Sequence, residues 1–273
     1  DMEKDATTEI GMPPMMKKQI RKEMHQIIWR RRWIQITKYA AVIALLVTSS
    51  LGVYSLLNTP ETQQMITANV KPGSKSEIIL PDGTKVQLNG ATTITYDVNS
   101  SKQRLVQLSG EAFFDVAKNP DCPFRVIANG LQIEVVGTSF NVNTYKKGVV
   151  ETSLLTGQIK ISGGSLPQEY ILTPGEKATY SSINNALKIT QADVHVETGW
   201  CDDYLIFDSE PLIDVIEEIE RWYGVKIELR CPQIGQDLLS GSFRHESIQN
   251  VIHSLSLQYK FKYEIHKDKI TIY

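Results

Sequence analysis

Residues 85–89 read KVQLN, and this short run carries the pattern that decides the fold of most of the chain. Apolar Val86 and Leu88 alternate with polar residues, and a period of two is typical of a β-strand with one buried face. The pattern recurs in LVQL (105–108), LQIEV (131–135) and QIKI (158–161). Turn signals separate the runs at Pro81-Asp82-Gly83, Asn89-Gly90, Asn129-Gly130, Lys147-Gly148, Gly163-Gly164 and Pro174-Gly175. Short strands with such turns predict a sandwich, barrel or solenoid over residues 70–192, without choosing among them.

Beyond residue 204 the pattern changes to strand, helix, strand. The predicted helix places Leu212, Val215, Ile216, Ile219, Trp222 and Tyr223 on one apolar face. The series then returns at a constant offset: Phe207, Glu210, Val215, Ile216, Tyr223, Lys226 and Glu228 correspond to Phe243, Glu246, Val251, Ile252, Tyr259, Lys262 and Glu264. We interpret this region as one α+β domain of two βαβ units, in which both helices cover one side of a shared sheet. Its strand edges would suit docking of a partner by strand addition.

Residues 39–57, YAAVIALLVTSSLGVYSLL, are uncharged and predict a membrane-spanning helix. At 1.5 Å per residue the stretch covers about 28 Å, close to the roughly 30 Å hydrocarbon core of a bilayer. The expected anchor residues include Tyr39, Ala40, Leu45, Leu46, Leu51, Tyr54 and Leu57. A cleaved signal peptide is the alternative, but its positive region would have to extend to Lys38, far longer than usual.

Basic residues are concentrated before this stretch. Lysines and arginines are frequent up to Lys38, whereas only Glu61 and then Lys71 follow closely, which predicts that the N-terminus lies in the cytoplasm. Residues 16–28 also place Met16, Ile20, Met24 and Ile27 on one helical face. This helix is either a solvated segment beside the membrane or part of a site that binds a cytoplasmic partner.

Composition and motifs indicate binding, not catalysis. The net charge of -2 gives no general attraction to nucleic acid. Cys122, Cys201 and Cys231 lack metal-ligand spacing, so we expect no metal site and no disulfide scaffold. The histidines are dispersed, and no catalytic or phosphate-binding motif is present, so we expect no enzymatic activity and no cofactor. We interpret the carboxylates around residues 202–203 and 217–220 as solvated.

Several motifs resemble one known family. They are Leu80-Pro81-Asp82-Gly83-Thr84, Leu108-Ser109-Gly110-Glu111-Ala112-Phe113-Phe114-Asp115-Val116, Pro123-Phe124-Arg125-Val126, Val136-Gly137-Thr138-Ser139-Phe140-Asn141-Val142, and Leu172-Thr173-Pro174-Gly175-Glu176-Lys177-Ala178. In this order they resemble FecR-like transmembrane anti-sigma regulators. The C-terminal unit is similar to the extra domain of Bacteroidetes-type members and to the short signalling domains of secretins and TonB-dependent transporters. The resemblance favours a solenoid-like twisted sheet, while the strand pattern still allows a sandwich.

The resemblance implies a function and a set of partners. Such a protein lies in the bacterial inner membrane and holds an extracytoplasmic-function sigma factor on its cytoplasmic side. Its periplasmic part contacts the signalling domain of a TonB-dependent transporter, and neither contact involves nucleic acid directly. Only about 38 residues precede the span, so the sigma-binding region is either truncated or unusually small. The alternative function is a membrane-anchored ligand-binding or structural envelope protein without a sigma partner.

Some relatives are described as cleaving themselves at a Gly-Thr bond, and Gly137-Thr138 is the matching dipeptide. There the hydroxyl of Thr138 would attack the preceding carbonyl, replacing an amide with a labile ester. The competing interpretation is a glycine at a point where strands pack closely. The full expectation is therefore a cytoplasmic basic segment (1–38), a transmembrane helix (39–57), a linker (58–75), a mainly β FecR-like domain (76–195) and a C-terminal docking domain (200–273).

Overall fold

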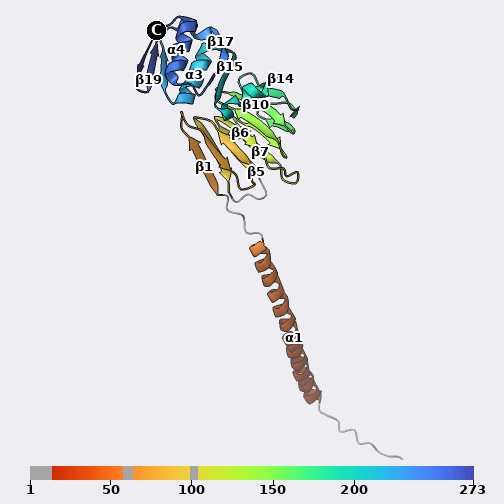
Figure 1. Ribbon diagram of the computed structural model, residues 1–273. Coiled ribbons are helices and arrows are strands. Elements are labelled where there is room, and N and C mark those ends of the chain that lie inside the picture. Colours follow the sequence, from red (N-terminus) through yellow and green to blue (C-terminus); the bar gives the residue numbers. More distant parts are fainter. Residues whose placement is uncertain (1–13, 58–63, 99–103) are drawn as a thin grey trace, which may run out of the picture. The chain divides into compact units, whose positions relative to one another are not determined.

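The computed structural model describes residues 14–57, 64–98 and 104–273, which belong to two compact units, Asp1–Pro60 and Glu61–Tyr273 (Figure 1). The first unit contains helix α1 (Pro14–Leu57). The second contains a β-sheet domain followed by a smaller domain of helices and strands. We describe each unit separately.

Helix α1 is continuous over 44 residues, which corresponds to about 66 Å of helix. Within it, Thr37–Ser55 is long and apolar enough to cross a membrane, and this segment overlaps the predicted span. The side chains of the expected anchor residues from Tyr39 to Tyr54 are exposed, as lipid-facing groups must be, while that of Leu57 lies outside the described residues. Residues 16–28 are the N-terminal part of the same helix, and most of their side chains are also outside the described set.

Two seven-stranded sheets form the β domain. In spatial order the first sheet consists of β1 (Met65–Val70), β4 (Thr92–Asp97), β5 (Arg104–Ser109), β7 (Phe124–Ala128), β8 (Leu131–Val135), β11 (Ile159–Gly163) and β12 (Tyr170–Leu172). The second consists of β14 (Ala186–Gln191), β13 (Glu176–Ser181), β10 (Val149–Thr156), β9 (Ser139–Asn143), β6 (Glu111–Asp115), β3 (Lys85–Leu88) and β2 (Ser76–Ile79). Neighbouring strands are antiparallel except for β5 and β7.

The two sheets enclose one apolar core, so the fold is a sandwich, one of the three architectures that the strand pattern allowed. Alternation puts one face of each strand inside: Val86 and Leu88 on β3 are fully buried. Within the second sheet, Phe114 on β6 stacks on Phe140 of the neighbouring β9 at 5.1 Å between ring centroids, and across the layers it meets Phe124 on β7 at 6.0 Å. This core supports the outer face of the second sheet, where the candidate site lies.

Strand β1 corrects the predicted domain boundary. Residues 58–75 were expected to be a linker, but Met65–Val70 pairs with β4 residue for residue along its whole length. Because β1 is at the edge of its sheet, most of its side chains are exposed and only Val70 is buried. Ile66, Ala68 and Val70 alternate with polar residues here as well, so the strand period extends into the expected linker.

The C-terminal domain follows a short connection made of α2 (Val194–Thr198) and the 3-10 helix η1 (Gly199–Asp202). It contains, in chain order, β15 (Tyr204–Pro211), α3 (Leu212–Tyr223), β16 (Lys226–Leu229), η2 (Pro232–Gln236), β17 (Leu238–Arg244), α4 (Ile248–Tyr259), β18 (Tyr263–His266) and β19 (Lys269–Ile272). Two strand–helix–strand units are therefore present, as predicted.

The expected single shared sheet is wrong. Strand β15 pairs antiparallel with β17, while β16, β19 and β18 form a separate three-stranded sheet. One core joins residues of α3 and α4 to both sheets, for example Leu205 of β15 and Ile270 of β19. The helices therefore lie between two small sheets (Figure 1). Helical periodicity shows that one face is apolar, but it does not specify which strands that face covers.

Candidate functional site at the junction of the two domains

The predicted cleavage dipeptide lies between β8 and β9. Thr138 is buried, and its hydroxyl donates to the carbonyl oxygen of Gln158 at 3.1 Å. A Cβ on Gly137 would lie 2.8 Å from Cβ of Lys118, so close packing by itself requires glycine here. This contact supports the packing interpretation, and cleavage of the bond stays a prediction.

A buried carboxylate organises the outer face of the second sheet. Glu111 on β6 accepts hydrogen bonds from the side-chain amides of Asn89 (2.8 Å), Asn141 (2.9 Å) and Asn143 (3.1 Å). Burial raises the pKa of Glu111, and the three amide donors oppose that rise. Asn89, Glu111 and Asn141 all belong to runs that the sequence analysis had singled out, but nothing in their spacing showed that they meet.

Trp200 connects this cluster to the following domain. The indole Nε1 donates to Oδ1 of Asn141 at 3.3 Å, and the side chain is 6% exposed. The backbone carbonyl of Trp200 accepts a hydrogen bond from Nζ of Lys75 at 2.6 Å. Lys75 also pairs with Asp203 at 2.7 Å and lies 3.8 Å from the ring centroid of Trp222 on α3. The hydrogen bond from Lys75 holds the pKa of the Asp203 carboxyl group below its ordinary value.

The backbones of the two domains approach each other unusually closely at three glycines. A Cβ on Gly90 would lie 2.9 Å from the carbonyl oxygen of Arg221, and one on Gly73 would lie 3.1 Å from that of Tyr223. From the other side, a Cβ on Gly224 would lie 3.0 Å from the carbonyl oxygen of Pro72. The amide of Gly73 also donates to the carbonyl of Arg221 at 2.8 Å. Side chains larger than hydrogen would push the domains apart.

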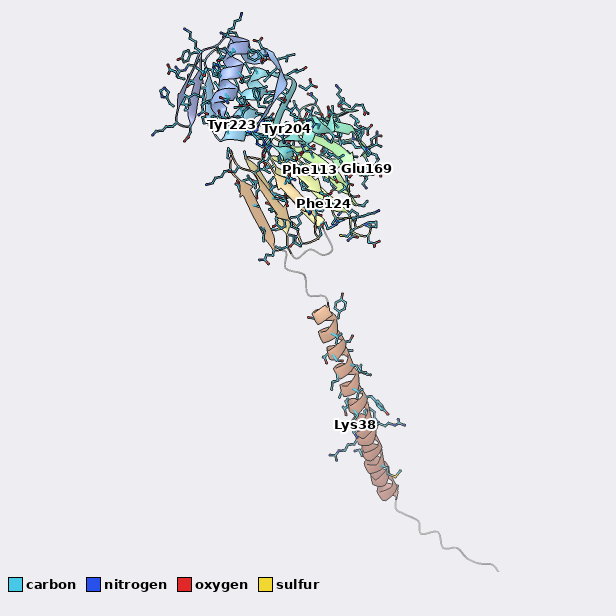
Figure 2. All side chains as sticks on the ribbon, viewed as in Figure 1. Lys38, Phe113, Phe124, Glu169, Tyr204 and Tyr223 are labelled. Carbon is cyan, nitrogen blue, oxygen red and sulfur yellow. The ribbon has the colours of Figure 1, made fainter. Side chains whose placement is uncertain are left out.

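Further contacts extend the same junction. The Arg221 guanidinium lies 4.3 Å from the ring centroid of Tyr145, whose hydroxyl donates to the carbonyl of Gly90. Burial, followed by the nearby charge of Glu111, raises the pKa of Tyr145. Lys146 pairs with Asp214 of α3 at 2.7 Å. Figure 2 shows Tyr204 and Tyr223 at the end of the C-terminal domain that meets the sandwich.

Between the domains lies a partly enclosed polar cavity of about 100 Å³. Carboxyl groups come from both domains: Glu111, Glu151, Glu197, Glu210 and Glu218. Lys177 reaches Glu197 at 2.9 Å and Glu151 at 3.5 Å. Burial, and then the charges of Glu111 and Glu210, raise the pKa of Glu218 to about 8. The interpretation of residues 217–220 as a solvated face is therefore wrong for Glu218, because this side chain lines the cavity opposite the sandwich.

Over the described ranges, no group of histidine, cysteine or acidic side chains could hold a metal ion. Cys201 and Cys231 are free thiols; Cys201 lies in η1, and Cys231 follows β16. The cavity offers hydrogen-bonding and charged groups from both domains.

These features define a class: a chain with one candidate membrane helix and a β sandwich locked to a small α+β domain. The model of the FecR protein family matches residues 66–160, and that of the FecR C-terminal region matches residues 204–272. The chain belongs to the FecR family. One helix able to span a membrane, together with this family, fits a single-pass membrane protein.

Two crystal structures of a protein from Parabacteroides distasonis, provisionally assigned as an anti-sigma factor, are similar to this chain. Each aligns with a TM-score of 0.70 and 28% sequence identity. The alignments cover 76% and 77% of this chain and 98% and 99% of the other chains. No curated protein matches.

Proposed function

We propose that this chain is an inner-membrane regulator that controls an extracytoplasmic-function sigma factor in response to a TonB-dependent outer-membrane transporter. Membership of the FecR family and similarity to an assigned anti-sigma factor support sigma regulation in general. The excess of basic residues before the span supports a cytoplasmic N-terminus and a periplasmic C-terminal bulk.

The observation that carries the proposal is the junction. Backbone contacts at Gly73, Gly90 and Gly224 fix the C-terminal domain against the sandwich without space for relative sliding. A partner that docks on the C-terminal domain would therefore act on both domains at once. Relay of a docking event towards the membrane needs this rigid connection, whereas two independently moving domains would lose the signal.

A free strand edge offers a place for the transporter's signalling domain. Strand β18 pairs with β19 on one side only. Lys262 and Tyr273 exchange two backbone hydrogen bonds, and from this pair onward the amides of β18 point alternately towards β19 and away from it. By that alternation the amides of Tyr263 and Ile265 point away from β19. An added strand would bind these amides.

Docking is tested by hydrogen exchange on the full chain in detergent micelles, with and without the signalling domain of a transporter from the same cell. We expect slower exchange of the amides of Tyr263 and Ile265 on binding. The edge strand β14 (Ala186–Gln191) is the control, because it belongs to the other domain. Equal protection of both strands, or of neither, would count against docking at β18.

Sigma regulation is tested by purifying the full chain from native membranes and by measuring sigma-dependent transcription. We expect a sigma factor to co-purify and its target genes to change expression when the chain is deleted. Recovery of envelope proteins alone, together with unchanged transcription, would favour the membrane-anchored structural protein instead.

A further inference from the structure

We propose that the cavity between the two domains binds a small organic ammonium ion, whose N–H groups donate to the carboxylates of Glu210 and Glu218. The site goes beyond the regulatory function proposed above and does not depend on it. Its walls come from both domains, so an occupant would contact the sandwich and the C-terminal domain together.

The charges of the cavity are unbalanced. Five carboxyl groups line it against two cationic groups, Lys177 and Arg221. Glu111 is bonded by three amides, and Glu151 and Glu197 are paired with Lys177. Within the part of the chain that the structure describes, Glu210 and Glu218 have no side-chain hydrogen bond and no ion pair. A cation that enters the cavity would meet two carboxyl groups with free acceptor capacity.

Glu218 is the more deeply buried of these two groups. An ionised carboxylate away from water is costly unless a donor or a cation compensates it. Glu218 is half-buried in the cavity wall, and this burial, followed by the charges of Glu111 and Glu210, raises its pKa to about 8. A bound ammonium would replace the proton: the carboxyl O–H bond breaks, the proton leaves to the buffer, and N–H donors of the ligand bind the resulting carboxylate.

The lining favours an ammonium over a metal ion. Its carboxyl groups do not converge as metal ligands would in the described residues. Trp200 also contributes to the walls, and aromatic faces attract organic cations. Tyr204 and Trp222 line the cavity too, but Arg244 and Lys75 already lie over their rings. The volume of about 100 Å³ would hold on the order of seven water molecules, which suits a molecule of a few non-hydrogen atoms.

The test is calorimetric titration of the full chain in detergent with ethylammonium chloride near neutral pH, repeated in two buffers of different ionisation enthalpy. We expect saturable binding with release of up to one proton, together with a rise in the melting temperature of the protein. In Glu218→Gln, affinity should fall about tenfold or more because the charged acceptor is lost. Glu77→Gln, an exposed change on β2, is the matched control and should bind as wild type.

Three results would overturn the proposal. The first is the absence of saturable binding of ethylammonium, methylammonium or putrescine to the wild-type chain. The second is an equal stabilisation by sodium chloride at the same concentration, which indicates charge screening alone. The third is unchanged affinity in Glu218→Gln and in Glu210→Gln, the second variant being used if the first does not fold. Each readout is made on the purified chain, so a failure is independent of any result on sigma factors.

Discussion

At the scale of single residues, Glu111 is the point where the polar contacts of the junction converge. Its carboxylate holds three asparagine amides, and one of these asparagines accepts the indole N–H of Trp200. Contacts run from Glu111 through Asn141 to Trp200, so Glu111 holds in place the surface against which the C-terminal domain packs. A buried acceptor with three donors is costly to remove, because the donors stay behind.

We expect Glu111→Ala to lower the free energy of unfolding by about 2–4 kcal/mol, since buried amide donors lose their partner and water must enter to satisfy them. Urea denaturation of the full chain in detergent measures the change. Glu169→Ala is the control, because the Glu169 side chain is 61% exposed and pairs only at 3.5 Å with Lys160. A loss of similar size in both variants would contradict the role assigned to Glu111.

Glu218 predicts a dependence of stability on pH. Its pKa in the folded protein is about 8 against an ordinary 4.5, so the folded state binds the proton more tightly than the unfolded state does. Without a bound cation, the contribution of Glu218 to the stability of the folded state should therefore be largest below about pH 4.5. It should fall as the pH rises towards 8. Melting temperatures of wild type and Glu218→Gln between these limits measure the effect.

The variant should show a weaker decline, not a flat curve, because the pKa values of Glu111 and Glu210 are raised in the same direction. Identical slopes in wild type and Glu218→Gln would show that Glu218 does not titrate in the folded protein. The positive charges of Arg221 and Lys146 both lower the pKa of Glu218, and both residues are present in the two proteins.

Thr138 allows a direct test of chain cleavage. If the hydroxyl attacks the carbonyl of Gly137, Thr138→Ala should abolish any fragment that ends at that bond, and Thr138→Ser should retain it because serine keeps a nucleophile. Electrophoresis with mass spectrometry of the fragments decides. A wild-type chain that stays intact in its native cells would eliminate the idea, and the hydrogen bond to Gln158 would then be the whole role of this hydroxyl.

At the scale of elements, the sequence predicted strands well where one face is buried. Alternation correctly marked β3, β5, β8 and β11, because each of these strands places every second side chain in the core. The alternation of Ile66, Ala68 and Val70 in β1 was too short to distinguish a strand from a linker. Alternation also could not give the partners of β15 and β16, which are β17 and β19 and lie far along the chain. The candidate site was hidden for the same reason, since Lys75, Gly90 and Arg221 are distant in sequence.

The close backbone contact at Gly90 predicts that a single methyl group will loosen the junction. In Gly90→Ala the new Cβ would lie 2.9 Å from the carbonyl oxygen of Arg221, and neither group can move as a flexible side chain could. We expect a cost of about 1–3 kcal/mol and a C-terminal domain that melts before the sandwich. Differential scanning calorimetry of the full chain would then show two transitions.

Gly241→Ala provides the matched control, because a Cβ at that position meets nothing within 4 Å and its backbone is not left-handed. Its melting curve should keep the wild-type shape. If Gly90→Ala also keeps that shape, the domains adjust to the methyl group and the junction is less rigid than the backbone contacts indicate.

At the scale of the whole molecule, the apolar segment of α1 determines where the protein resides. Leu46 lies at the middle of Thr37–Ser55 and is exposed. Leu46→Arg should reduce insertion, because an arginine at the centre of a spanning helix costs about 2.5–3.5 kcal/mol. The measurement is the fraction of chain that resists alkaline extraction from membranes, with Leu46→Phe as control. Equal extraction of both variants would contradict a spanning role.

The duplicated C-terminal domain has a consequence for proteolysis. Each of its sheets combines strands from both copies, β15 with β17 and β16 with β18 and β19, and its core draws on both helices. Neither copy alone contains a complete sheet or a complete core. A single cut in η2, between the copies, would leave two fragments that depend on each other to stay folded. Cleavage by a protease at this point would therefore unfold the whole domain in one step once the fragments separate. Stepwise loss of one copy with the other still folded is not expected.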